Sequence, residues 1–434
     1  MRISVIGCGY LGAVHAACMA ELGHDVVGVD VDETKVAELA AGRAPFFEPG
    51  LPEVLARGVA SGRLRFTTDM AETAGARVHF VAVGTPQTAG SHAADLRYVD
   101  AAVGGLLPHL SDGDLVVGKS TVPVGTAARL GDLVRASSGA DLAWNPEFLR
   151  EGFAVADTLS PDRFVYGVPG GEGGERATAL LDEVYAGPLT AGMPRLVTDY
   201  ATAELVKVSA NAFLATKISF INAMAEIAEA TGADVTQLAD AIGHDARIGR
   251  RFLNAGLGFG GGCLPKDIRA FQARADELGL ESLAFLADVD AVNMRRRRYV
   301  VDLALEMLGE VVGAKVAVLG LAFKPDSDDV RDSPALDVAR ALQEAGAHVV
   351  AYDPEANTTA ALVAPGLEYV DSVDEAIQGA ALALVLTEWR QFRGLDPEAV
   401  GRSMAHRRVI DARTVLDLAL WRDHGFEARG LGRP

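Results

Sequence analysis

Cys263 is the residue in this chain best placed to act as a nucleophile. It lies in the run Gly-Phe-Gly-Gly-Gly-Cys-Leu-Pro-Lys-Asp, residues 258–267, whose glycines leave the space around the thiol free of side chains. Pro265 predicts a helix that begins just past the cysteine, and Lys266 adds a nearby positive charge. A helix N-terminus and a cation both favour the thiolate, which is the reactive form. We therefore predict a reactive thiol at Cys263.

A glycine-rich turn at the start of the chain carries a second chemical signature. The apolar run 3–6 leads into Gly7-Cys8-Gly9-Tyr10-Leu11-Gly12, and an alanine-rich helix is expected to follow and to stop at Gly23. Glycines here permit a sharp turn and a close approach of backbone to a pyrophosphate, which the helix N-terminus then binds. The next predicted strand, 25–29, ends at Asp30, where a carboxylate binds ribose hydroxyls and repels a 2′-phosphate. The pattern predicts a site for NAD.

A thiol beside a nicotinamide permits more than the oxidation of an alcohol. Loss of one hydride gives a carbonyl, to which a cysteine can add as a thiohemiacetal. Loss of a second hydride leaves a thioester, and hydrolysis gives an acid. Two alternatives stay open at this point. One is a two-electron dehydrogenase in which Cys263 is structural; the other is a nucleotide-binding sensor without turnover, because a fold does not guarantee a function.

Three polar residues share one face of a long predicted helix. Neither proline nor glycine interrupts residues 200–230, where Glu204, Lys207 and Asn211 lie three and four residues apart. The helix is apolar on more than one side, which indicates an inter-domain spine or a dimer interface. Taken alone, Lys207 is typical of a solvated lysine, and only a partnership with Cys263 makes it a catalytic candidate.

Several loops follow predicted strands in the first half of the chain. The strands 78–83 and 115–118 precede Gly84-Thr85-Pro86 and Lys119-Ser120-Thr121, and ligands of open parallel sheets gather beyond such strand ends. Asn145 as a cap and Pro146 as the first helical residue predict a helix, with Glu147 and Glu151 on one face. The glycine-rich run 167–174 is expected to be a flexible loop.

A second sheet unit is predicted near the C-terminus. Its strand 316–319, its helix from Pro334 and its strand 349–352 repeat the first pattern without the glycine fingerprint, so this unit is suited to a different nucleotide. Candidate phosphate contacts in its loops and in the basic spot before Cys263 are Lys324, Arg331, Arg413, Arg247, Arg250 and Arg251. The run Arg295–Arg298 is expected to decorate an exposed helix.

Composition excludes several other classes of function. The 434 residues are 49% apolar and carry a net charge of -19, which disfavours nucleic acid and anionic membranes as partners. No run approaches the roughly 20 apolar residues that cross a bilayer. The N-terminus lacks the pattern of a secretory signal, so a cytoplasmic location is expected. Cys8 and Cys18 are interpreted as buried, inert thiols, and no metal-site spacing is present.

Taken together, these motifs resemble those of the nucleotide-sugar dehydrogenases, the UDP-glucose/GDP-mannose dehydrogenase family, over essentially the whole chain. The resemblance implies an α/β protein with two Rossmann-like doubly wound domains joined by a long central helix and a helical connector. The implied domains are an NAD domain at 1–199, a connector and dimerisation region at 200–300, and a nucleotide-sugar domain at 301–434. A homodimer is implied, in which Arg247 reaches a substrate in the neighbouring subunit.

The resemblance also implies roles for individual residues. Cys263 would be the nucleophile, Lys207 and Asn211 would stabilise oxyanions, Asp267 would help Lys207 to activate water, and Thr121 and Glu147 would hold a water and pass protons. The implied NAD contacts are Gly7, Gly9, Tyr10, Leu11, Gly12, Asp30, Lys35, Thr85, Thr121, Glu151, Lys266 and Arg331. The implied substrate contacts are Glu147, Phe148, Leu149, Glu151, Lys207, Asn211, Arg247, Phe252, Asn254, Gly260, Lys324 and Arg413. No metal is implied.

The implied reaction is a four-electron oxidation of UDP-glucose at C6 to UDP-glucuronate. Leu264 and Ala412 stand where Phe and Gly are commoner in this branch of the family. These departures keep GDP-mannose or another nucleotide sugar open as the alternative substrate, whereas Asn254-Ala255-Gly256 favours the UDP-glucose branch.

Overall fold

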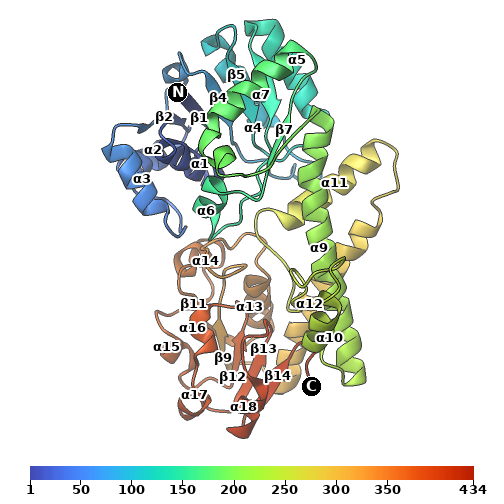
Figure 1. Cartoon of the computed structure of the whole chain (residues 1–434). Coiled ribbons are helices and arrows are strands. Elements are labelled where there is room, and N and C mark those ends of the chain that lie inside the picture. Colours follow the sequence, from blue (N-terminus) through green and yellow to red (C-terminus); the bar gives the residue numbers. More distant parts are fainter. The chain divides into compact units, whose positions relative to one another are not determined.

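The computed structural model describes all 434 residues and divides into two compact units. The first comprises Met1–Ala210 with Ala273–Leu280, and the second comprises Asn211–Gln272 with Glu281–Pro434. Each unit contains one sheet, labelled in Figure 1. The predicted fold class is confirmed.

The sheet of the first unit has the strand order β3-β2-β1-β4-β5-β6-β7-β8 and is parallel except between β6 and β7. Its central strands are apolar and buried on both faces, as expected where helices cover both sides of a parallel sheet. The strands are β1 (Arg2–Ile6), β2 (Asp25–Val29), β3 (Leu64–Thr67), β4 (Val78–Val81), β5 (Leu115–Gly118), β6 (Asp141–Trp144), β7 (Phe164–Gly167) and β8 (Arg195–Thr198).

Two apolar cores lie in the first unit, in agreement with helices on both faces of its sheet. Its α-helices are α1 (Tyr10–Glu21), α2 (Glu33–Ala40), α3 (Leu51–Ala60), α4 (Arg97–Leu106), α5 (Thr126–Ser138), α6 (Ala154–Leu159), α7 (Glu172–Val184) and α8 (Ala186–Thr190), with short 3₁₀ turns at Met70–Thr73 and Leu107–His109. Cys8 and Cys18 are fully buried in one of these cores, which confirms their interpretation as inert thiols.

Two local expectations in this unit are wrong. No helix begins at Pro146, because the buried Asn145 side chain makes other hydrogen bonds instead of capping one, and α6 starts only at Ala154. The loop predicted at 167–174 is shorter than expected, since β7 ends at Gly167 and α7 begins at Glu172, which leaves only residues 168–171 between them. Here glycine serves close packing: a Cβ at Gly174 would lie 2.0 Å from the Pro169 carbonyl oxygen.

His15 is an unusual member of the first core. It lies on α1 with its ring 4.3 Å from that of Phe80 between centroids, and neither ring nitrogen has a hydrogen-bond partner. Burial, followed by repulsion from Lys119 and His24, lowers the pKa of His15 well below its ordinary value. The folded chain therefore keeps this histidine neutral at a pH where the unfolded chain protonates it.

Because its pKa is lowered, His15 should contribute to a fall in the free energy of unfolding as the pH decreases. Below the unfolded pKa of about 6.5, the unfolded state binds a proton that the folded state does not. Between pH 7.5 and 5.5 this group should cost about 1.4 kcal/mol of unfolding free energy, and a His15→Leu variant should lack that loss. Urea unfolding of both proteins at the two pH values measures the difference. Equal pH slopes for the two proteins would contradict the assignment.

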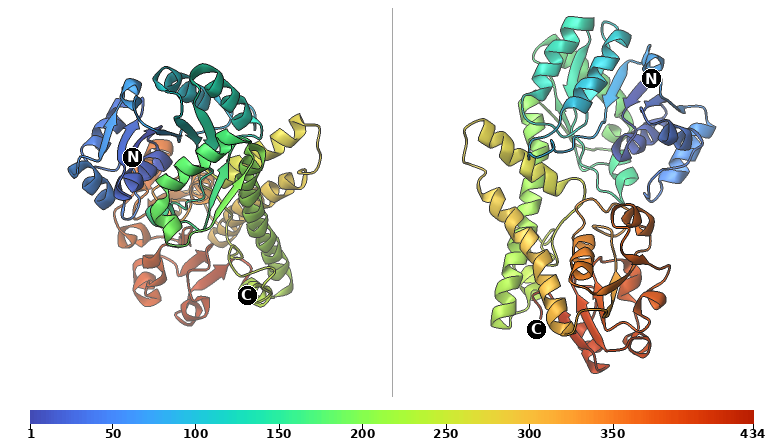
Figure 2. Two further views of the ribbon diagram at one scale, coloured as in Figure 1. Left: turned by 45° about the horizontal axis from the view of Figure 1, so that its top comes forward. Right: turned by 180° about the vertical axis from the view of Figure 1, so that it is seen from behind.

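The long predicted helix is confirmed as α9 (Tyr200–Thr231). In the second unit its C-terminal part, from Asn211 onward, lies beside α12 (Phe285–Leu308), as Figure 2 shows. Ser219 Oγ donates to the Val289 carbonyl at 2.7 Å, and Arg296 pairs with Glu229 at 2.8 Å. Side chains far apart in the sequence therefore join the two helices.

The expectation that Arg295–Arg298 decorate an exposed helix is wrong for two of the four residues. Arg296 and Arg297 are 0% and 3% exposed. Buried arginines are tolerated only when they are paired, and their carboxylate partners are supplied by Glu229 for Arg296 and by Asp332 and Asp337 for Arg297. Arg295 remains on the surface with Glu226.

The second unit contains a fully parallel six-stranded sheet of order β11-β10-β9-β12-β13-β14. Its other elements are α10 (Val235–Gly243), α11 (Leu264–Glu277, whose last residues belong to the first unit), β9 (Lys315–Leu319), α13 (Pro334–Glu344), β10 (His348–Tyr352), α14 (Asn357–Val363), β11 (Glu368–Tyr369), α15 (Val373–Ile377), β12 (Leu382–Val385), α16 (Arg390–Arg393), α17 (Pro397–Ser403), β13 (Arg408–Asp411), α18 (Leu418–Asp423) and β14 (Glu427–Gly430). The predicted strands and helix of this unit are confirmed.

Asp353 ends β10 at the position that corresponds to Asp30 at the end of β2. Its Oδ2 accepts hydrogen bonds from the backbone N–H groups of Leu321 and Ala322 and from the Trp389 indole. Its Oδ1 accepts from the N–H groups of Glu355 and Ala356. The carboxylate is thus fully engaged by the protein itself.

Candidate functional site

The glycine turn between β1 and α1 has the geometry of a pyrophosphate cradle. Gly7 has a φ of +88°, which favours glycine, and a Cβ at Gly12 would lie 1.8 Å from the Gly7 carbonyl oxygen. A Cβ at Gly9, in contrast, would meet no atom within 4 Å. The first and third glycines therefore serve the turn and its packing, while Gly9 borders open space where a ligand fits against bare backbone. These residues fit a dinucleotide.

Asp30 lies at the carboxyl end of β2, as predicted, and its carboxylate also supports the glycine turn. Its Oδ2 accepts from the Cys8 N–H at 2.8 Å, and both of its oxygens lie 3.1 Å from Lys35 Nζ. The two predicted ribose contacts, Asp30 and Lys35, are thus brought together as an ion pair beside the turn.

Glu48, which no sequence signal identified, connects the glycine turn to the segment that holds Glu147 and Glu151. It is 2% exposed and accepts from the backbone N–H groups of Gly152 and Ala154 at 2.6 and 2.7 Å. The Tyr10 hydroxyl, within the glycine fingerprint, donates to the same carboxylate. Burial and then this neighbour raise the pKa of Tyr10 above its usual range. Glu48 is missed because all of its partners are distant in sequence.

Glu147 is held in place by a buried lysine. Lys119 is 4% exposed, and its Nζ lies 3.1 Å from Glu147 Oε2 and 3.0 Å from Asn145 Oδ1. Glu147 Oε1 accepts from the N–H groups of Phe148 and Leu149 at 2.7 and 3.0 Å. The loop after β5 was a predicted ligand loop, but the pairing of its lysine with Glu147 was not foreseen. Thr121, in the same loop, is half-buried.

Of the remaining candidates of the first unit, Lys207 lies beside the Phe148 ring. Lys207 Nζ lies 5.5 Å from the centre of the Phe148 ring, and the Arg163 guanidinium lies 4.0 Å from it. Such cation–π contacts orient both side chains. Thr85 is buried and Glu151 is half-buried.

Cys263 is exposed and immediately precedes α11, so the predicted helix start is confirmed. Its carbonyl oxygen accepts the first helical hydrogen bond, from the Asp267 N–H at 3.0 Å. The thiol therefore lies at the N-terminus of a 14-residue helix, which favours a thiolate.

Asp267 joins two of the predicted residues in the second unit. The side chain is 2% exposed, and its two oxygens lie 2.6 Å from Asn211 Nδ2 and 2.5 Å from Lys266 Nζ. Asn211, Asp267 and Lys266 thus form one buried polar group, one turn along α11 from Cys263. Both carboxylate oxygens have donors, which fixes the orientation of the Asn211 amide.

The predicted nucleotide-sugar contacts have varied surroundings in the second unit. Arg413 donates to the carbonyl oxygens of Gly258 and Leu386 at 2.9 and 3.0 Å, and burial lowers its pKa. Arg247 is exposed and paired with Asp245. Phe252 has a φ of 64°, Asn254 accepts from Arg250, and Lys324 Nζ lies 5.6 Å from the Phe323 ring centre. Arg331, which was predicted as an NAD contact, pairs with Asp329.

The predicted catalytic residues therefore belong to two groups. Thr121, Glu147 and Lys207 lie in the first unit, whereas Asn211, Cys263 and Asp267 lie in the second. No group of three or more His, Cys, Asp or Glu side chains has an arrangement that could hold a metal ion. No helix is both long and apolar enough to cross a bilayer. The functional groups that these residues supply are a thiol, carboxylates, amides and cations.

Comparison with known families yields three consecutive matches. Residues 1–187 match the NAD binding domain of the UDP-glucose/GDP-mannose dehydrogenase family, residues 201–295 match its central domain, and residues 317–418 match its UDP binding domain.

Individual proteins give the same result over full length. The chain is 43% identical to a UDP-glucose 6-dehydrogenase of Rhizobium meliloti, with 100% of both chains covered. It is 41% identical to the UDP-glucose 6-dehydrogenase TuaD of Bacillus subtilis, with 100% of this chain and 93% of the relative covered. Among solved structures, a UDP-glucose dehydrogenase from Pyrobaculum islandicum matches with a TM-score of 0.91 at 41% identity, covering 100% of this chain and 98% of the other.

Proposed function

The chain belongs to the UDP-glucose/GDP-mannose dehydrogenase family and is an NAD-dependent oxidoreductase, and we propose that it oxidises UDP-glucose at C6 to UDP-glucuronate through covalent intermediates on Cys263. The observation that carries the proposal is the exposed thiol at the N-terminus of α11, one turn before the buried Asp267. Full-length identity to UDP-glucose 6-dehydrogenases supports the choice of sugar and base.

The first oxidation converts the C6 hydroxyl to an aldehyde. NAD supplies the hydride acceptor in both oxidations. We propose that the hydroxyl proton leaves through water held by Thr121 and Glu147, with Lys207 stabilising the alkoxide. The Lys119 ammonium and the two backbone donors fix the Glu147 carboxylate in one orientation, as positioning a proton acceptor requires.

The second oxidation proceeds on the thiol. Cys263 Sγ adds to the aldehyde carbon, and the resulting oxyanion is stabilised by Lys207 and Asn211. Loss of the C6 hydride then leaves a thioester. Water, oriented by Asp267 and Glu147, attacks the acyl carbon and releases the carboxylate and the free thiol. For each sugar the whole reaction consumes two NAD and one water, and it produces one carboxylate, two NADH and three protons.

The ligand contacts and the domain division implied by the family resemblance also remain proposals. We assign NAD to the glycine turn with Asp30, Lys35 and the other residues named above, and the nucleotide sugar to the set that includes Arg413 and Lys324. The functional division is 1–199, 200–300 and 301–434. The packing at Gly9 and Gly12 supports the NAD assignment.

We further propose a homodimer built around α9. Phe213, Phe220 and Ile227 recur at intervals of seven residues and are 67%, 50% and 58% exposed, which is an apolar stripe that a partner helix can cover. Exposed Arg247 is free of burial in the single chain, as a residue that reaches a neighbouring subunit must be. Sedimentation should give twice the 45.4-kDa chain mass, and a monomer at micromolar concentration would reject the dimer.

Counting NADH tests the function. We expect two NADH for each UDP-glucose consumed and UDP-glucuronate as the product, because four electrons leave one carbon. The purified protein is incubated with NAD and UDP-glucose, GDP-mannose or UDP-N-acetylglucosamine in turn, with NADH followed by absorbance and sugars by mass spectrometry. One NADH for each UDP-glucose would reject the proposed covalent intermediates on Cys263. Two NADH with GDP-mannose, and none with UDP-glucose, would show that GDP-mannose is the substrate.

A further inference from the structure

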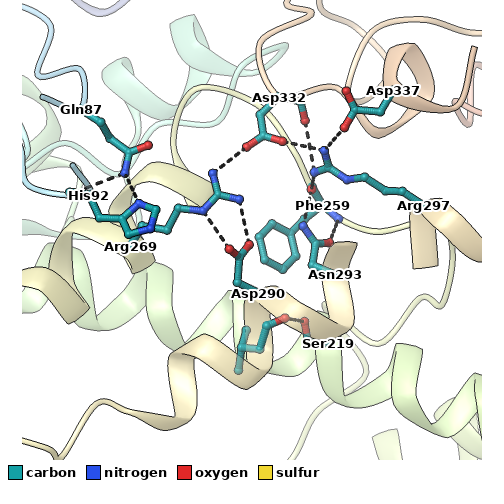
Figure 3. Close-up of polar contacts among 11 residues, drawn as sticks. Gln87, His92, Ser219, Phe259, Arg269, Asp290, Asn293, Arg297, Asp332 and Asp337 are labelled. Carbon is teal, nitrogen blue, oxygen red and sulfur yellow. Dashed lines mark hydrogen bonds and ion pairs between the residues drawn. The ribbon is translucent and has the colours of Figure 1, made fainter. Parts of the chain in front are cut away.

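Side chains of α12 bind both the backbone N–H and the backbone carbonyl of Phe259, four residues before Cys263. Asn293 Oδ1 accepts from the Phe259 N–H at 2.7 Å, and Asn293 Nδ2 donates to the Phe259 carbonyl at 3.0 Å (Figure 3). Arg297, one turn later on the helix, donates to the same carbonyl at 2.8 Å. Asn293 and Arg297 are 0% and 3% exposed. Buried side chains thus make the backbone hydrogen bonds that a neighbouring strand would make in a sheet.

The helix that follows Cys263 is tied to the same elements. Arg269 on α11 pairs with Asp290 of α12 at 2.9 Å and with Asp332 at 3.3 Å. Asp332 also accepts from Arg297 at 2.7 Å, as Figure 3 shows. Its backbone φ is +46°, which is uncommon for a residue other than glycine. Asp332 therefore joins the arginine that holds the loop before Cys263 to the arginine on the helix after it.

The loop between these anchors cannot order itself. Gly258, Gly260, Gly261 and Gly262 lose more conformational freedom on folding than any other residue would. The surrounding fit is close, because a Cβ at Gly258 would lie 2.4 Å from Asn293 Oδ1 and one at Gly260 would lie 2.2 Å from the Asp332 carbonyl oxygen. Glycine is therefore required for these contacts. They hold the loop together with the hydrogen bonds from Arg413 to the Gly258 carbonyl and from the Gly261 N–H to the Arg331 carbonyl, both at 2.9 Å.

We propose that Asn293, Arg297 and Asp332 form a clamp that positions Cys263 for its reaction. The three act through the backbone on either side of the cysteine, so they are positioning residues. The inference rests on the proposed nucleophilic role of Cys263. A nucleophile displaced by about 1 Å reacts roughly 100-fold more slowly, so loosening the loop should lower kcat more than it changes the binding of NAD.

Two variants and a matched control test the clamp. Asn293→Asp keeps the size of the side chain but removes the N–H donor to the Phe259 carbonyl. Arg297→Lys keeps the charge that faces Asp332 and Asp337 but removes the fork that also reaches that carbonyl. Arg295→Ala, on the same helix, removes an exposed arginine that pairs with Glu226 and touches no part of the clamp.

The readouts are kcat, the KM values for NAD and UDP-glucose, and hydrogen–deuterium exchange of the peptide covering residues 257–263. We expect faster exchange and a kcat lowered about 10- to 100-fold in both clamp variants, with KM for NAD within about twofold and Arg295→Ala near wild type. Unchanged exchange, or faster exchange with unchanged kcat, would overturn the clamp. If Asn293→Asp does not fold, Arg297→Lys decides.

Failure of the clamp is distinguishable from failure of the proposed function. Wild-type protein that makes fewer than two NADH for each UDP-glucose rejects the function, and the exchange measurement, which needs no substrate, still decides whether the clamp orders the loop.

Discussion

Replacing Cys263 with serine should abolish the formation of acid, with a fall of at least about 1,000-fold in the rate of UDP-glucuronate production. A serine hydroxyl is far less acidic than a thiol, so its reactive, deprotonated form is scarce and the carbonyl is not captured efficiently. Single-turnover NADH formation and mass spectrometry of the sugar measure the effect. Binding of NAD, which depends on the glycine turn, should remain within about twofold of wild type.

Cys18→Ala is the matched control for this variant. Cys18 is fully buried beside α6, where burial raises its pKa to about 12, so it should take no part in the reaction. Near-normal acid formation in Cys263→Ser, or its loss in Cys18→Ala without a loss of fold, would be incompatible with the mechanism proposed above.

The second large effect should come from the glycine turn, where two alanine substitutions ought to fail for different reasons. In Gly12→Ala the new Cβ would lie 1.8 Å from the Gly7 carbonyl oxygen, a backbone atom that cannot move alone. We expect this variant to lose about 3 kcal/mol of stability, or about 10 °C in melting temperature, and to bind NAD poorly because the turn is displaced.

Gly9→Ala should leave the fold intact but lower the affinity for NAD at least about 10-fold. The reason is that the methyl group occupies the side of the backbone that the pyrophosphate approaches. Gly9 has a φ of -67° and a ψ of -165°, which alanine adopts readily, and its Cβ would meet no atom within 4 Å. Calorimetric melting and NAD titration of the two variants separate the effects. Equal melting temperatures for both would show that the close contact at Gly12 relaxes cheaply.

Much of the fold and part of the site were predictable because they depend on short-range rules. Alternating strands and helices, glycines at a sharp turn and a proline after Cys263 are all local signals, and each predicted the element that the structure contains. The long helix of residues 200–230 was equally clear, since no residue in it interrupts helical hydrogen bonding.

Side-chain partners that are distant in the sequence could not be predicted from local sequence. Arg297 resembles any surface arginine until Asp332, 35 residues away, and the Phe259 carbonyl, 38 residues away, are placed beside it. The role of Glu48 is visible only from its hydrogen bond to the N–H of Gly152, 104 residues later. The expected helix with Pro146 as its first residue was wrong for the same reason, because Asn145 Oδ1 accepts from Lys119 and Tyr185 and does not act as a cap.

The saturated carboxylate of Asp353 bears on how many cofactors one chain can carry. Asp30 and Asp353 occupy equivalent positions, because the six strands of the second sheet follow the same order as the first six strands of the eight-stranded sheet. Topology alone would therefore suggest two dinucleotide sites. A carboxylate has about four lone-pair positions, and Asp353 already accepts five hydrogen bonds from Leu321, Ala322, Trp389, Glu355 and Ala356. Asp30 accepts four hydrogen bonds, from the Cys8 and Asp32 N–H groups and from Lys35, so the two carboxylates alone do not distinguish the units. The turns do, because Ala322 and Pro325 follow β9 at the places where Gly9 and Gly12 follow β1. We therefore expect one NAD for each polypeptide, and we expect the two NAD molecules of the proposed cycle to bind in succession at the glycine turn of the first unit.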